Sequence, residues 1–426
     1  MNNILKQTLT NMRQQPLLTV LTIAGTALAI CLMMVVVMTR EVQLVDYGNE
    51  PNRSRTLYVK YLHIASENGG NIYSNMTMRT VNGVFAKMKT PEAIALYSRG
   101  LVTIDTNVPG GDIVPLHIKS VNAAFFKVFS LDFIDGQPFT DEECQSNAPI
   151  ALLSRSTCRR LFGREDNVRG KTFMIAHHEY RVAGIVENVS PLLKCATSDI
   201  WVPMSTDHEQ PYPLASAGLN PKYFVYVAMM AKHTDEFPAI QAETERMRTA
   251  YNKTIAPDTL YLMGQPDEQD TFVNRIWASP GPDMDEIHKS YLIIFIILLI
   301  VPAINIASMT QSRLQQRREE IALRRTFGAT RSTILWQTFA ESLVQTLIAG
   351  VIGLLLCFVI CYFAADFVFD KNRWEEAGVT FTLDANVLFS PVLYGWALLF
   401  CLLLNTLSSI IPAWRASRGN IVDALK

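Results

Sequence analysis

The sequence predicts an integral membrane protein with four transmembrane helices and a large α+β extracytoplasmic domain inserted between helices 1 and 2. Four uncharged, largely apolar runs each exceed the ~20 residues with which a helix crosses about 30 Å of hydrocarbon. A polar region at 40–289 separates the first run from the second and is long enough to bury its own core. The runs are Leu17–Thr39, Ser290–Ser312, Ser342–Ala365 and Ala385–Trp414.

The distribution of charge predicts which segments stay inside the cell, because translocation of short Lys- and Arg-rich segments is disfavoured. The tail 1–16, the segment 313–341 and the tail 413–426 have net charges of +2, +3 and +2. The loop and span entry at 366–390 has −3 and the region 40–289 has −5. We therefore expect both termini and 313–341 to be cytoplasmic, with the other two segments outside.

The first 39 residues predict an interfacial helix followed by an anchor. Residues 1–16 can form a short amphipathic helix that Pro16 separates from transmembrane helix 1 at 17–39. This run is longer than the roughly 7–15 residues of a signal-peptide core, so we expect it to remain in the membrane. Gly25 and Ala29 form a small-xxx-small pair and are candidates for dimer packing, although chance explains the pair equally well.

Alternating apolar residues and turn signals predict a split α/β unit in the region 40–289. Its halves are 56–115 and 223–277, and a β-rich insert at 121–205 lies between them. The predicted strands are Thr56–Leu62, Ala93–Asp105, Val114–Val121, a run after Pro149, Gly170–Ile175, Tyr180–Val189, Asp199–Ser205 and Tyr223–Ala231. The predicted helices are Met78–Lys89, one around Phe125, Phe126 and Phe129, one ending at Gly163, and Pro238–Asn252.

The remaining boundaries follow from the apolar runs: transmembrane helix 2 at 290–312, a cytoplasmic hairpin at 313–341, and helices 3 and 4 at 342–365 and 391–412. The spans contain no Asp, Glu, Lys, Arg or His. Ion-driven carriers usually place ionisable groups on the ion path, so this composition disfavours that class.

Neither a catalytic, a cofactor-binding nor a metal site is expected from the residue patterns. The segment Gly163–Thr172 resembles a P-loop, but Glu165 stands where the first glycine belongs. His177 and His178 are adjacent, and neighbours on a strand point to opposite faces, so ordinary strand-end histidines are expected. Of the three external cysteines, Cys144 and Cys158 could pair, and this alternative stays open.

The hairpin at 313–341 is predicted to be a docking element. Gly328 suits a left-handed helix cap and Thr330 can cap a second helix that runs into the next span. Inside-positive topology and lipid headgroups explain several of its arginines. Topology does not require the carboxylates or the apolar Ile321, Leu323 and Phe327, which favour contact with a cytoplasmic partner.

Three segments resemble the permeases of the MacB/FtsX-type ABC transporter family. The segment REEIALRRTFGATRSTILWQTFAES at Arg318–Ser342 is similar to the family's coupling-helix region. The external run from Val121 to Met204, and the tail PAWRASRGNIVDALK at Pro412–Lys426, resemble the family as well. With the four-span layout, the resemblance covers nearly the whole chain.

The resemblance implies a split porter-like external domain and a dimer, either a homodimer or a pseudo-dimer with a related permease. It implies that a separate ABC ATP-binding subunit binds the ATP, that this chain is not itself an enzyme, and that it lies in the bacterial inner membrane. A periplasmic adaptor is a further candidate partner, and no nucleic acid is expected. The implied ATPase-coupling residues are Glu319, Glu320, Ile321, Leu323, Arg324, Arg325, Phe327 and Gly328.

Two functions remain open beside mechanical coupling for export or extraction of a substrate. One is a regulatory scaffold whose external domain activates a cell-wall hydrolase outside the membrane. The other is a membrane-anchored receptor or enzyme, which needs chemistry in the external domain that the sequence does not reveal.

Overall fold

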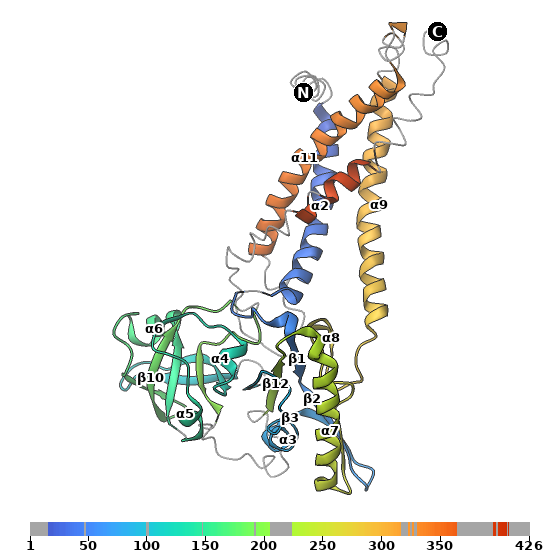
Figure 1. Ribbon diagram of the computed structural model, residues 1–426. Coiled ribbons are helices and arrows are strands. Elements are labelled where there is room, and N and C mark those ends of the chain that lie inside the picture. The colour runs from blue at the N-terminus through green and yellow to red at the C-terminus, as the bar shows by residue number, and fades with distance from the viewer. Residues whose placement is uncertain are drawn as a thin grey trace. The chain divides into compact units, whose positions relative to one another are not determined.

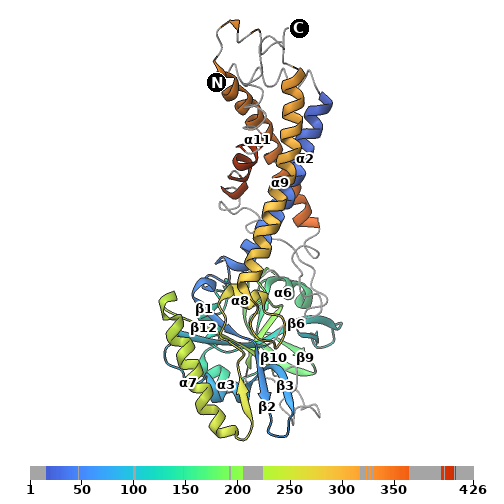
Figure 2. The same ribbon diagram turned by 90° about the vertical axis from the view of Figure 1, so that its right-hand side faces the viewer.

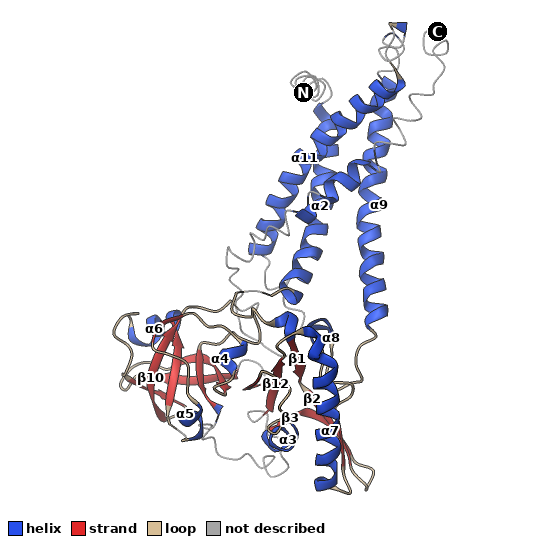
Figure 3. Ribbon diagram, viewed as in Figure 1, coloured by secondary structure: helices blue, strands red, loops and turns tan. Residues whose placement is uncertain are grey.

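The computed structural model contains a helical unit and a strand-rich unit, which are described separately (Figure 1, Figure 3). The helical unit combines residues 1–41, 285–370 and 383–426, and the strand-rich unit combines 42–284 and 371–382. The structure describes residues 16–46, 48–98, 102–146, 148–190, 193–204, 224–316, 323, 326–327, 330–363, 395–397, 399–406 and 408.

Long apolar helices build the helical unit. They are α2 (Pro16–Leu44), whose last residues belong to the strand-rich unit, α9 (Met284–Gln316) and α11 (Arg331–Phe363). Among the described residues, two stretches are long and apolar enough to cross a membrane, Thr19–Leu44 and Trp336–Phe363, and a shorter apolar helix covers Gly395–Thr406. The predicted interfacial helix at 1–16 lies outside the described residues except for Pro16, which begins α2.

Strand β12 (Phe224–Met230) joins the two predicted halves of the external domain. It pairs antiparallel with β1 (Thr56–Val59), β3 (Asn71–Thr77) and β4 (Ala93–Ser98), which all come from the first half. All seven residues of β12 are buried, which is typical of a strand covered on both faces. The sheet continues from β3 to β2 (Tyr61–Ala65) and β13 (Thr259–Tyr261).

Helices α3 (Met78–Val84) and α7 (Phe237–Ile255) lie side by side and pack on this part of the sheet (Figure 2). Because successive side chains on a strand point to opposite faces, β12 contributes side chains to two hydrophobic cores. Val225, Val227 and Met229 belong to the cluster with the two helices, whereas the alternate residues pack into the second core.

The β-rich part continues the same sheet in the order β11-β8-β10-β9-β5-β6-β4. Its strands are β5 (Val102–Asn107), β6 (Val114–Val121), β7 (Phe133–Asp135), β8 (Ile150–Ser154), β9 (Thr172–Ile175), β10 (His178–Val186) and β11 (Ile200–Pro203). Strand β5 pairs with β6 and β9, so the end of the predicted half 56–115 belongs with the insert. The accompanying helices are α4 (Phe125–Val128), α5 (Asp141–Gln145) and α6 (Arg155–Phe162).

Several local predictions agree with the structure and others need correction. Gly163 caps α6 with a φ of 68°, in the left-handed region that suits glycine. The predicted single strand Thr56–Leu62 is instead two strands, because the backbone amides of Lys60 and Tyr61 leave the ladder and donate to Gln265 Oε1 at 2.8 and 3.2 Å. Cys144 and Cys158 are both free thiols.

Candidate functional site

Two apolar side chains are exposed in the described part of the predicted coupling hairpin. Leu323 is 54% exposed and Phe327 is 84% exposed, one helical turn apart. The Phe327 amide donates to the Leu323 carbonyl at 3.2 Å, and so does the Thr326 hydroxyl at 2.6 Å. The other predicted coupling residues lie outside the described residues: Glu319, Glu320, Ile321, Arg324, Arg325 and Gly328.

Thr330 begins the second helix of the hairpin as the sequence predicts. Its hydroxyl accepts the Thr333 amide at 3.2 Å, which satisfies one of the first N–H groups of α11. Trp336, 68% exposed, follows on the first turns of α11. The Thr330 cap fixes the first residue of α11, and docking of this segment to a partner remains a prediction.

The dimer-packing candidates occupy two environments within the chain. Ala29 is buried in the helical unit, and Gly25 is half-buried. Their neighbour Ala27 is fully buried and lies against Gly353 of α11. The small residues of α2 therefore already serve helix packing within one chain, and dimer packing by Gly25 and Ala29 remains a prediction.

The P-loop-like segment and the adjacent histidines, for which no binding site is expected, lie at turns beside strands. Gly170, with a φ of 83°, and Lys171 lead into β9. Ala176 and His177 form the turn between β9 and β10, and His178 begins β10. Within the part of the chain that the structure describes, no group of three or more His, Cys, Asp or Glu side chains could hold a metal ion.

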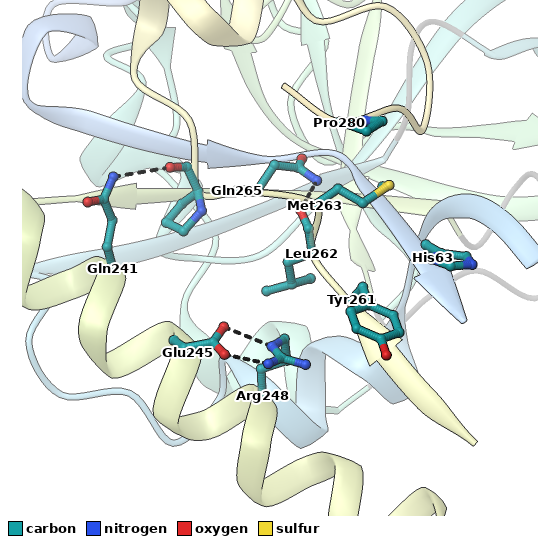
Figure 4. A pocket seen from close by; sticks show the side chains of 11 residues that line it. His63, Gln241, Glu245, Arg248, Tyr261, Leu262, Met263, Gln265 and Pro280 are labelled. Carbon is teal, nitrogen blue, oxygen red and sulfur yellow. Dashed lines mark hydrogen bonds and ion pairs between the residues drawn. The ribbon is translucent and has the colours of Figure 1, made fainter. Parts of the chain in front are cut away.

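An open groove of about 570 Å³ lies in the strand-rich unit between α7 and the segment that follows β13 (Figure 4). Gln241, Glu245 and Arg248 line it from α7. The opposite side contains His63, Tyr261, Leu262, Met263, Gly264, Gln265, Pro266 and Pro280. This volume lies in the usual range of small-ligand sites.

An ion pair and stacked rings define the character of the groove. Arg248 donates to both carboxylate oxygens of Glu245, and this hydrogen bonding lowers the pKa of the Glu245 carboxyl. The His63 ring stacks on Tyr73 at 4.3 Å and on Tyr261 at 5.4 Å between ring centroids. Glu245 and Arg248 thus neutralise each other, and the stacked rings form an aromatic edge of the groove.

Nothing in the sequence pattern predicts this groove. His63, Tyr73 and Tyr261 are direct cross-strand partners in β2, β3 and β13. Aromatic residues in three strands predict a ring stack only when the pairing of the strands is known. The sequence pattern does not predict β3 or β13. Glu245 and Arg248 could have been recognised as an i,i+3 pair on a helix.

Comparison with known proteins reveals relatives of the ABC transporter permease type. The chain is 22% identical over 312 residues to "Macrolide export ATP-binding/permease protein MacB" of Escherichia coli (strain K12), covering 72% of this chain and 43% of MacB. It is 22% identical over 314 residues to "Uncharacterized ABC transporter permease YknZ" of Bacillus subtilis (strain 168), covering 72% and 69%. The chain thus spans less than half of the length of the MacB relatives that it matches.

Solved structures similar to the chain cover the external domains of such proteins. The periplasmic region of MacB from Actinobacillus actinomycetemcomitans matches with a TM-score of 0.36 and 15% identity, over 53% of this chain and 95% of that one. The extracellular domain of YknZ matches with a TM-score of 0.33 and 14% identity, over 48% and 99%.

Two family models match the chain in consecutive segments. The MacB-like periplasmic core domain matches residues 17–247, which is more than half of the sequence. The FtsX-like permease C-terminal model matches residues 292–421, the part that contains α11 and the hairpin. The chain therefore belongs to the MacB/FtsX-like family of ABC transporter permeases.

Proposed function

We propose that this chain is the permease and mechanotransmission subunit of an ABC transporter. In this proposal a separate ATP-binding subunit hydrolyses ATP in the cytoplasm, and the permease passes the resulting movement to its external domain. That domain exports or extracts a substrate on the outer side of the membrane. The observation that carries the proposal is the pair of exposed apolar side chains, Leu323 and Phe327, on a hairpin within the FtsX-like part of a family member.

The proposed contact has a physical rationale. Apolar side chains that are exposed in the free chain gain free energy when a partner's groove removes them from water. Charged neighbours on such an element select the partner and its orientation more than they raise affinity. Leu323 and Phe327 would fill the groove of the ATP-binding subunit, while Glu319, Glu320, Arg324 and Arg325 set the orientation.

The proposed topology places four helices across the inner membrane with both termini and the hairpin in the cytoplasm. Its support is the charge asymmetry of the sequence, with +3 on 313–341 and −5 on 40–289. The apolar helices α2 and α11 supply two of the spans, and α9 and the helix at Gly395–Thr406 supply the others in this proposal. Two such permeases would form the dimer, either as two copies of this chain or as this chain with a related permease, and neither would supply a catalytic group.

Co-purification tests the proposed contact. The full chain is isolated in mild detergent as wild type, as Leu323→Asp/Phe327→Asp, and as Ile113→Asp, a control that also changes an exposed apolar side chain. Wild type and the control should retain a partner that hydrolyses Mg·ATP. The double variant should retain less than about a tenth of the partner that the wild type retains, which is the effect expected for a hot-spot residue.

Equal retention by the double variant would contradict the proposed contact. Recovery of a cell-wall hydrolase on the external domain, without ATP-dependent movement of any substrate, would favour the regulatory scaffold over export.

A further inference from the structure

A buried arginine holds the end of helix α2 inside the strand-rich unit. Arg53 lies directly before β1 and is only 4% exposed. Its guanidinium donates to the carbonyl oxygens of Val42 at 2.6 Å and Val45 at 3.1 Å. The last carbonyls of a helix have no partner within the helix, so Arg53 satisfies groups that the end of α2 leaves open.

Glu50 extends this contact to the β-rich part of the sheet. Its carboxylate, 2% exposed, accepts Arg53 Nε at 2.6 Å on one oxygen. The other oxygen accepts the backbone amides of Cys195 at 3.0 Å and Ala196 at 2.9 Å, just before β11. Burial lowers the pKa of Arg53, but the Glu50 carboxylate raises it above its usual value, so the guanidinium stays charged.

A second buried pair holds the connector that leads to α9. Arg275 follows α8 (Gln269–Asn274) and donates to both carboxylate oxygens of Asp267, and the two side chains are 1% and 3% exposed. The same guanidinium donates to the carbonyl of Ser279 at 2.8 Å, within the connector, and to that of Met263 at 3.3 Å.

Other ion pairs of the strand-rich unit are of a different kind. Arg55 and Glu92 are 31% and 43% exposed, and Arg155 and Glu187 are both 40% exposed. Exposed ion pairs contribute little to stability and break at low cost. A buried pair that loses one partner leaves an uncompensated charge, which is strongly destabilising. The two buried pairs are therefore stiff connections, and each binds a segment that leads into a long apolar helix.

We propose that Arg53–Glu50 and Arg275–Asp267 are the joints through which movement of helices α2 and α9 reaches the external domain. Each planar guanidinium bonds a carboxylate and two backbone carbonyls at once, so a shift of either segment must break these bonds or move the groups that they hold. The Arg53–Glu50 joint acts on the segment before β11, and β11 pairs with β6. This inference rests on the proposed function and names its positioning residues.

The test uses the full chain in complex with the ATP-binding protein that co-purifies with it. A fluorophore on Ile113→Cys, in the exposed turn before β6, reports the response of the external domain to Mg·ATP. The variants are Glu50→Gln at one joint and Asp267→Asn at the other, and each removes the charge of the carboxylate but keeps its shape. Glu243→Gln is the matched control, because Glu243 is also buried and also accepts two backbone amides, those of Lys89 and Thr90.

Both joint variants should keep the bound ATPase but show a response about tenfold smaller, while the control responds as wild type does. Amide exchange at Cys195 and Ala196 should be about 10- to 100-fold faster in Glu50→Gln, because hydrogen bonds to a charged group are lost. The thermal unfolding midpoint of each variant is compared with that of Glu243→Gln. A variant with a similar midpoint and a smaller response has lost transmission and not its fold.

A wild-type response in both joint variants would overturn the inference and leave the proposed function standing. If Leu323→Asp/Phe327→Asp also keeps the response, or if the wild type shows none, the proposed function fails and the inference fails with it.

Discussion

Gly353 in α11 lies so close to α2 that a Cβ atom on it would stand 2.6 Å from the carbonyl oxygen of Ala27. The same atom would stand 3.1 Å from Ile30 Cβ. A glycine at this point lets the two helix backbones approach closely, which is the usual way in which apolar helices gain packing energy in a membrane.

Gly353→Ala should therefore destabilise the helical unit, since the added methyl group forces α2 and α11 apart. Overpacking of this kind costs about 1–3 kcal/mol. Thermal unfolding of the full chain in detergent measures the effect as a lower midpoint.

The matched control is Gly395→Ala, because a Cβ atom at Gly395 would meet nothing within 4 Å. This change should leave the midpoint unchanged or raise it, since alanine favours helix over glycine by about 1 kcal/mol. Equal midpoints for Gly353→Ala and wild type would show that the helices do not depend on this contact.

The free energy of unfolding should depend on pH because folding lowers the pKa of Glu243. Burial raises the pKa of its carboxyl, but hydrogen bonds from Thr90 and Lys89 outweigh burial and hold the pKa below its usual value. A carboxyl whose pKa is lowered by folding contributes stability above its unfolded value of about 4.3, and this stability is lost as pH falls through the folded value.

The unfolding midpoint of the wild type should thus fall below about pH 5 more steeply than that of Glu243→Gln. At neutral pH the variant should be less stable by about 1 kcal/mol, because a neutral amide accepts hydrogen bonds more weakly than a carboxylate. Parallel curves for the two proteins from pH 7 to about pH 3 would refute this role for Glu243.

Cys195 should be an unreactive thiol in the folded chain. Burial raises the pKa of its thiol to about 11, with the Glu50 carboxylate adding to the increase. The thiolate is the reactive form, and at pH 8 only about one thiol in a thousand would carry it. Iodoacetamide should alkylate Cys195 rapidly only after the chain unfolds in urea, as mass spectrometry can measure.

Cys144 provides the comparison, since burial raises the pKa of its thiol to about 11 as well but its side chain is partly exposed. It should react before Cys195 in the folded chain. Equal rates for the two thiols without urea would contradict the buried position of Cys195.

Elements with a strong local signal could be predicted from the sequence. The strand at Val114–Val121 has the predicted bounds, and the helix that ends at Gly163 has its left-handed cap. Apolar runs and turn glycines act over a few residues, so one stretch of sequence contains the information. The all-apolar strand from Phe224 to Met230 belongs to the same class.

Features that depend on distant partners could not be predicted. Arg53 lies in a polar stretch that reads as a solvated linker, yet it is buried because Glu50 and the carbonyls of α2 surround it. Glu50 in turn bonds Cys195, 145 residues along the chain. The groove between α7 and β13 has the same origin, because its aromatic residues come together only through strand pairing.

Mechanical coupling to a cytoplasmic ATPase requires that Phe327 lies on the cytoplasmic side of the membrane. A membrane-impermeant maleimide applied to spheroplasts tests it directly, with Phe327→Cys compared with Ile113→Cys, since both side chains are exposed. With the proposed topology, Ile113→Cys should react in intact spheroplasts and Phe327→Cys should react only after detergent opens the membrane. Labelling of Phe327→Cys in intact spheroplasts would place the hairpin outside the cell and contradict its contact with a cytoplasmic ATPase.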